Sequence, residues 1–223
     1  MTLIKTLLST TILAAAITAC GSTSDDKTVA SMAALDAAVA GEHRSDKNKA
    51  RDQYRNPKET LAFFGFTSDM TVVEITPGGG WYTEVLAPAL KGTGKLYGAH
   101  YPDTGADNYY SKSRQRLEKK LASNDVFSEV VLTDFTPKVA SELAPAGTAD
   151  LVLTFRNLHN WGEEGMAQVY KDAYKALKKG GVMGVVEHRM PESQSWEENK
   201  RSGYVPEKMA IKYALAAGFT LAA

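Results

Sequence analysis

The amino-acid sequence predicts an α/β fold: a doubly wound, mostly parallel β-sheet with helices on both faces. The first observation is the alternation of short apolar runs with amphipathic segments that begins after residue 56. The second is the segment 71–90, where the β-branched run VVEI (72–75) precedes TPGGG (76–80) and then apolar residues at helical spacing. A strand, a glycine turn and a helix in this order are typical of the first unit of such a sheet.

The remaining elements follow from the same patterns. The predicted strands span residues 71–75, 95–99, 128–132, 149–154 and 181–187. The predicted helices of the sheet domain span residues 80–90, 107–122, 138–143, 164–177 and 206–217. After the last helix, Gly218 reads as a stop and residues 219–223 as the start of another strand. We expect either a truncated record or a sheet edge left open beside the fifth strand.

Two further helices are expected before the first strand. Residues 31–40 are alanine-rich, with Ser31 as the N-cap and a weak apolar face that predicts loose docking. Residues 57–64 follow Asn56, which suits an N-cap, while Glu59 can complete a capping box.

Length and composition define one domain. With 223 residues, 43% of them hydrophobic and 23% charged, the chain fits one globular domain, assigned to residues 56–223, plus extensions. Lysine and arginine together number 26, as do aspartate and glutamate, so the formal net charge is zero. This balance indicates no broad attraction to nucleic acid, and we expect no nucleic-acid partner.

The first residues resemble a bacterial lipoprotein signal. Lys5 precedes an apolar run over residues 7–19, which is too short to span a bilayer, and the run ends at Cys20, the only cysteine. We expect residues 1–19 to be removed, Cys20 to be lipidated, and residues 20–55 to form a tether and a helical extension. The alternative is a plain secretory signal with an incidental cysteine. Because no Asp follows Cys20, the resemblance favours an exported protein anchored to the outer membrane, facing the periplasm.

Polar side chains gather where the predicted strands end. They are Glu74, His100, Asp134, Asn157, His159, Glu187 and His188. The carboxyl ends of parallel strands meet at one edge of a sheet, which is where ligands bind in such folds. A divalent metal is one possible occupant, but the spacings match no metal signature, so we predict none. Acid–base or substrate-orienting roles for the histidines are favoured.

The strand order, the acid before the glycine turn and DLVL (150–153) resemble class I S-adenosylmethionine-dependent methyltransferases. Three segments carry a narrower resemblance to exported bacterial predicted methyltransferases. They are RNPKETLAFFG (55–65), EITPGGGWYTE (74–84) and RNLHNW (156–161), and the resemblance runs from about residue 42 to the end. It implies a Rossmann-like fold and S-adenosyl-L-methionine as the cofactor.

The resemblance also implies residue roles. The cofactor-binding residues it implies are Glu74, Thr76, Pro77, Gly78, Gly79, Gly80, Tyr82, His100 and Asp134. Among them, Glu74, Pro77, Gly78 and Gly80 would line the methionine and ribose side, and Asp134 would face the adenine. Two positions depart from the family pattern: Thr76 replaces the usual first glycine, and His100 or Tyr101 replaces the acid that grips the ribose.

Two functions remain open from the sequence. In the first, the protein is an enzyme that methylates a small-molecule nucleophile, with His159 as the base and with Arg156 and Asn157 orienting the substrate. In the second, it is a non-catalytic, membrane-anchored lipoprotein that keeps the fold and binds a nucleoside-like or other small ligand.

Overall fold

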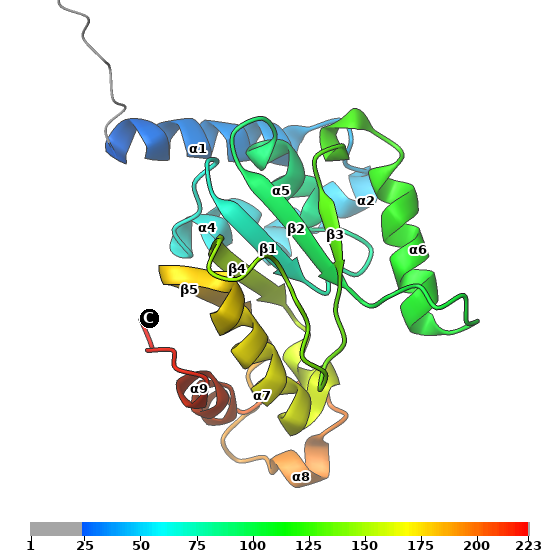
Figure 1. Ribbon diagram of the computed structural model, residues 1–223, viewed down its shortest axis with the longest axis vertical. Helices are drawn as coiled ribbons and strands as arrows, with labels where there is room; N and C mark the ends of the chain where they lie inside the picture. The colour runs from blue at the N-terminus through cyan, green and yellow to red at the C-terminus, as the bar shows by residue number, and fades with distance from the viewer. Residues whose placement is uncertain (1–23, 223) are drawn as a thin grey trace, which may run out of the picture.

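A computed structural model describes residues 24–222 and shows a five-stranded parallel sheet between layers of helices (Figure 1). The strands are β1 (Thr71–Ile75), β2 (Lys95–His100), β3 (Val131–Asp134), β4 (Ala149–Phe155) and β5 (Leu177–Val186). Their spatial order is β3-β2-β1-β4-β5, and every neighbouring pair is parallel. The predicted fold class is therefore confirmed.

Within residues 24–222, four α-helices precede β1, three lie between strands and two follow β5. They are α1 (Ser24–Ala40), α2 (Asp46–Lys49), α3 (Asp52–Arg55), α4 (Pro57–Phe63), α5 (Thr83–Leu90), α6 (Tyr109–Leu121), α7 (Leu158–Ala176), α8 (Trp196–Asn199) and α9 (Glu207–Ala216). No helix among residues 24–222 combines the length and the apolar character that crossing a membrane requires.

Both faces of the sheet are buried, as expected for a parallel sheet covered by helices. Val73 and Ile75 point to one face, where they pack in the same cluster as α7 residues such as Met166. Val72 points to the other face, together with residues of α1, α4 and α5. Glu74 is on this second face and is buried as well, because side chains alternate along a strand.

The segment before β1 is more tightly docked than the sequence predicts. In α1, Leu35 is completely buried, so the prediction of loose docking is wrong. Ser31 is not an N-cap but lies inside the helix, where its Oγ donates to the Lys27 carbonyl and accepts from the Ser68 amide. Asn56 does precede α4, but in the left-handed conformation and without a side-chain cap, so no capping box forms.

Three further predictions are corrected by the structure. Residues 138–143 form no helix: Lys138 has a φ of 72°, and the Ser141 amide donates to Asp172 of α7, so a tertiary contact holds an irregular loop. The third strand begins at Val131 rather than at residue 128. Residues 219–222 are irregular instead of starting a strand, and within the described chain β5 pairs with β4 alone.

Candidate active site

The glycine turn joins β1 to α5 at the carboxyl edge of the sheet. Thr76, Gly78 and Gly80 all have positive φ angles, of 55°, 59° and 78°. Glycine adopts this region freely, whereas the left-handed conformation destabilises the backbone at Thr76 by about 1–2 kcal/mol. The Thr76 hydroxyl is also buried, and it has no hydrogen-bond partner among residues 24–222. The turn therefore keeps the backbone path of a glycine motif although threonine occupies its first position.

Glu74 is the buried acid of the site. Its side chain accepts a hydrogen bond of 2.6 Å from the Thr83 hydroxyl, at the start of α5. Burial raises the pKa of Glu74 to about 7, and this bond and the charge of Lys120 offset only part of the effect. Glu74 can therefore change its charge near neutral pH, and a cation bound beside it would favour the carboxylate.

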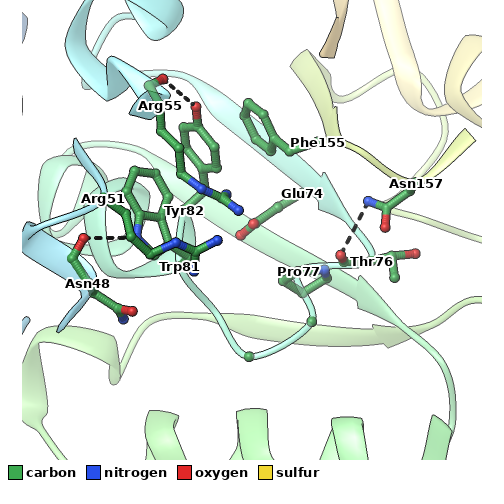
Figure 2. Close-up of a pocket in the computed structure, with 12 residues that line it drawn as sticks. Asn48, Arg51, Arg55, Glu74, Thr76, Pro77, Trp81, Tyr82, Phe155 and Asn157 are labelled. Atoms are coloured by element: carbon green, nitrogen blue, oxygen red, sulfur yellow. Dashed lines mark hydrogen bonds between the residues drawn. The ribbon is translucent and has the colours of Figure 1, made fainter. Parts of the chain in front are cut away.

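A cavity of about 260 Å³ opens beside the turn (Figure 2). It is lined by Asn48, Arg51, Arg55, Glu74, Thr76, Pro77, Gly78, Gly79, Trp81, Tyr82, Phe155 and Asn157. A Cβ added to Gly78 or Gly79 would meet no atom within 4 Å. Side chains at these two positions would occupy open space instead of protein, so the turn leaves room for a ligand against its backbone.

Six of the cofactor-binding residues that the sequence predicts line this cavity together: Glu74, Thr76, Pro77, Gly78, Gly79 and Tyr82. Gly80 does not line the cavity. A Cβ on Gly80 would lie 3.0 Å from both Leu117 and Lys120, so this glycine serves the close approach of α6 to the turn.

The opposite wall of the cavity comes from α2, α3 and the residues beside them. The sequence predicts this segment to be an extension outside the sheet domain. Trp81 Nε1 donates to the Asn48 carbonyl at 3.1 Å, and the Tyr82 hydroxyl donates to the Arg55 carbonyl at 3.2 Å (Figure 2). Asn48, Arg51 and Arg55 were not predicted as site residues. The one available signal was two arginines four residues apart, directly before the Asn-Pro segment.

The aromatic part of the wall is a stacked pair. The rings of Tyr82 and Phe155 lie 3.5 Å apart, at 8° to each other. Tyr82 belongs to the helical side of the glycine turn and Phe155 to the end of β4, so the pair closes the cavity between two strands that are far apart in sequence.

Asn157 lies where β4 leads into α7. Its Nδ2 donates to the Thr154 hydroxyl at 3.1 Å and to the Ile75 carbonyl at 3.3 Å. It also donates to the Thr76 carbonyl at 3.4 Å (Figure 2). These bonds tie the end of β4 to the glycine turn, while the side-chain carbonyl of Asn157 makes no hydrogen bond to the described residues.

His159 lies in the first turn of α7, before a break at Gly162. It does not line the cavity but lies two residues beyond Asn157, which does. His159 Nδ1 is 3.1 Å from both carboxylate oxygens of Glu187, which follows β5. Because a carboxylate only accepts, Nδ1 carries the proton, and Nε2 of the neutral ring is left as an acceptor. This arrangement suits a general base.

The other predicted edge residues do not line the cavity. His100 is completely buried, its Nδ1 donates to the Tyr101 carbonyl, and burial lowers its pKa. Asp134 is exposed and pairs with Arg114 at 3.0 Å. His188 is exposed and lies beside the Tyr204 ring. Arg156, with a φ of 62°, directly follows β4. In the part of the chain that the structure describes, no three His, Cys, Asp or Glu side chains are grouped to hold a metal.

Comparison with known proteins places the fold. No family model matches the sequence, and no curated protein matches it. Among solved structures, a SAM-dependent methyltransferase from Aquifex aeolicus is 15% identical with a TM-score of 0.62, over 78% of this chain and 85% of that one.

Two further structures give similar values. The glycopeptide N-methyltransferase MtfA, in complex with S-adenosyl-L-methionine, is 13% identical with a TM-score of 0.53, over 75% of this chain and 78% of that one. CrArsM, an arsenic(III) S-adenosylmethionine methyltransferase from Chlamydomonas reinhardtii, is 17% identical with a TM-score of 0.53, over 68% of this chain and 52% of that one. The fold is thus that of the class I S-adenosylmethionine-dependent methyltransferases.

The residues of the cavity fit this cofactor. The open space above Gly78 and Gly79 would receive a ligand along the backbone, and Glu74 offers a buried carboxylate to a cationic group. Thr76 lies on the same wall and makes the cavity narrower there than a glycine would.

Proposed function

We propose that the protein transfers a methyl group from S-adenosyl-L-methionine to a small-molecule nucleophile. The observation that carries this proposal is the cavity formed by Glu74 and the glycine turn at the carboxyl edge of a class I methyltransferase sheet. When bound, the cofactor supplies an activated methyl group on a sulfonium. The chain's own contribution is to bind and orient the two reactants and to remove a proton.

His159 is the base of this proposal. Glu187 holds the proton on Nδ1, so Nε2 can accept the proton of the nucleophile, and the carboxylate stabilises the resulting imidazolium. Arg156 and Asn157 orient the nucleophile from the segment between β4 and His159. Tyr82 and Phe155 supply the apolar wall. The proposal also assigns the cofactor side of the site to His100, Asp134 and Gly80. His100 and Gly80 would support the glycine turn from the side that faces α6, without lining the cavity. Neither the described residues nor the comparisons favour the alternative of a binding lipoprotein without turnover.

Calorimetric titration of S-adenosyl-L-methionine at several pH values tests the proposal. The cofactor carries a net positive charge, so binding should lower the pKa of Glu74 from about 7 and favour its ionised form. Affinity should therefore rise with pH, by up to about tenfold between about pH 6 and pH 8. The Glu74→Gln variant should bind without this rise.

S-adenosylhomocysteine is the matched control ligand, because it lacks the sulfonium charge and should show a smaller pH dependence. Failure of the wild-type protein to bind either compound would contradict the proposed function. Binding with a flat or falling pH profile would leave the function standing and contradict the role of Glu74.

The N-terminal segment is proposed to export the protein and anchor it to the outer membrane by a lipid on Cys20, facing the periplasm. Cys20 and the preceding residues lie outside the described residues, and the support is the lipoprotein-like pattern ending at this single cysteine. Cys20→Ser should abolish labelling with a radioactive fatty acid and move the protein out of the membrane fraction. If the variant still sediments with membranes to the wild-type extent, the anchor is not this cysteine.

A further inference from the structure

Two arginines line the cavity, and the charge of a third, Arg156, acts on one of them. Arg51 and Arg55 line it from the N-terminal segment (Figure 2). Arg156 is not a lining residue, but it follows β4 between two that are, Phe155 and Asn157. Within residues 24–222, none of the three guanidinium groups has a carboxylate within salt-bridge distance. Arg55 instead lies over the Trp81 ring, at 4.7 Å from its centroid.

Arg44 shows that a guanidinium in this neighbourhood can be paired. It packs against the same Trp81 ring, at 5.2 Å, and it binds Asp52 through both terminal nitrogens at 2.8 and 2.7 Å. Arg44 is buried, and its charge is paired with Asp52 and, at 3.7 Å from its Nε, with Glu84. By contrast, Arg51 and Arg55 line the cavity. The unpaired charge is thus concentrated where a ligand would bind.

The three charges also act on one another. Burial, followed by the charges of Arg51 and Arg156, lowers the pKa of Arg55 to about 10. At neutral pH Arg55 still carries its charge, so the cluster repels itself and the repulsion is not relieved by deprotonation. A bound anion would relieve it, because guanidinium groups bind carboxylates in a planar, two-bond geometry.

The cofactor alone does not bring net negative charge into the cavity. S-adenosyl-L-methionine has one carboxylate but also an ammonium and a sulfonium, so its binding adds net positive charge to the cavity. Glu74 contributes at most one negative charge and points to the site from the sheet (Figure 2). The positive charge of the three arginines would therefore favour a second anionic group in the cavity once the cofactor is present.

We propose that the methyl acceptor is an organic acid, and that its carboxylate is held by Arg51 and Arg55 with Arg156 adding positive charge nearby. This inference rests on the proposed function and names the substrate class of the same site. The carbon skeleton of the acid would pack against the stacked rings of Tyr82 and Phe155, which form the apolar wall of the cavity. An aromatic or other flat, apolar acid suits this wall.

Benzoate and its neutral counterpart benzamide are the probes that test the inference. In calorimetric titrations of the protein saturated with S-adenosylhomocysteine, benzoate should bind and benzamide should bind at least about 10-fold more weakly. Arg55→Gln and Arg51→Gln should each weaken benzoate binding by about 10- to 100-fold, since each removes charge-assisted hydrogen bonds. Arg116→Gln is the matched control: Arg116 is exposed on α6, away from the cavity, and its loss should leave benzoate binding unchanged.

A second pair of ligands separates the two possible sources of the carboxylate. If the arginines bind the acceptor, Arg51→Gln and Arg55→Gln should change the affinities for S-adenosylhomocysteine and for 5′-methylthioadenosine, which lacks the amino-acid group, by similar small factors. A loss confined to S-adenosylhomocysteine would show that the arginines hold the cofactor's own carboxylate, and would overturn the inference. Equal binding of benzoate and benzamide, or no benzoate binding by a protein that binds S-adenosylhomocysteine, would also overturn it while the proposed function stands. Arginine-dependent benzoate binding by a protein that binds no S-adenosylhomocysteine would contradict the proposed function instead.

Discussion

Replacing His159 by alanine is expected to reduce turnover by about 10²- to 10⁴-fold, the usual contribution of a positioned general base. The affinity for S-adenosyl-L-methionine should change little, because His159 does not line the cavity beside the glycine turn. The measurement is the rate of S-adenosylhomocysteine formation with an acid acceptor, together with calorimetric titration of the cofactor on the same preparation.

Two neighbouring substitutions sharpen this experiment. Glu187→Gln should also lower the rate, because Glu187 fixes the proton on His159 Nδ1 through two contacts of 3.1 Å. His188→Ala is the matched control: His188 is exposed just after the same strand, and its bond to Glu187 comes from the backbone amide, which the substitution keeps. Full activity in His159→Ala would rule out His159 as the base. If His159→Ala and His188→Ala lowered turnover by the same factor, the loss would reflect a general disturbance of this edge of the sheet and not the removal of a base.

Filling the space above the glycine turn is expected to eliminate cofactor binding. Gly78→Leu would place a side chain where the cavity now has no atom within 4 Å, and we expect a loss of affinity of about 100-fold or more. Calorimetry with S-adenosyl-L-methionine measures the loss, and circular dichroism with thermal unfolding reports on the fold.

Strain must be separated from bulk in this test, since Gly78 has a φ of 59°. Gly78→Ala pays the same left-handed strain with almost no added volume, so it should lower the stability similarly but retain most of the binding. Gly79→Leu adds the bulk at a position whose φ is not positive, and it should also abolish binding. Unchanged affinity in both leucine variants would place the cofactor elsewhere. Gly80 is unsuitable as a probe, because its substitution would press against Leu117 and Lys120 and disturb α6.

Much of the sheet is predictable from local sequence. The run over residues 71–75 becomes β1 with the predicted bounds, and the strands predicted at 95–99 and 149–154 each gain one residue. These segments are β-branched or apolar and end in turn residues, so neighbouring residues alone favour the strand. For residues 138–143 the same local reasoning predicts a helix that does not form. A hydrogen bond from the Ser141 amide to Asp172 of α7 outweighs the modest helical preference of this segment.

The site divides in the same way. By itself the sequence determined the glycine turn and the acid Glu74 before it, because a strand end followed by glycines restricts the backbone locally. It also predicted Asn157 as a site residue, and the structure places Asn157 in the lining of the same cavity. Only the tertiary structure decided that Arg51 and Arg55 would face the same cavity. Their position depends on Trp81 and Tyr82, whose side chains bind backbone carbonyls 33 and 27 residues earlier in the chain. Likewise, only packing against α6 decided that His100 would be buried, with Ser113 at 3.3 Å from its ring. Such contacts join segments whose separation in sequence carries no local signal, so the fold must form before the charges around the cavity are defined.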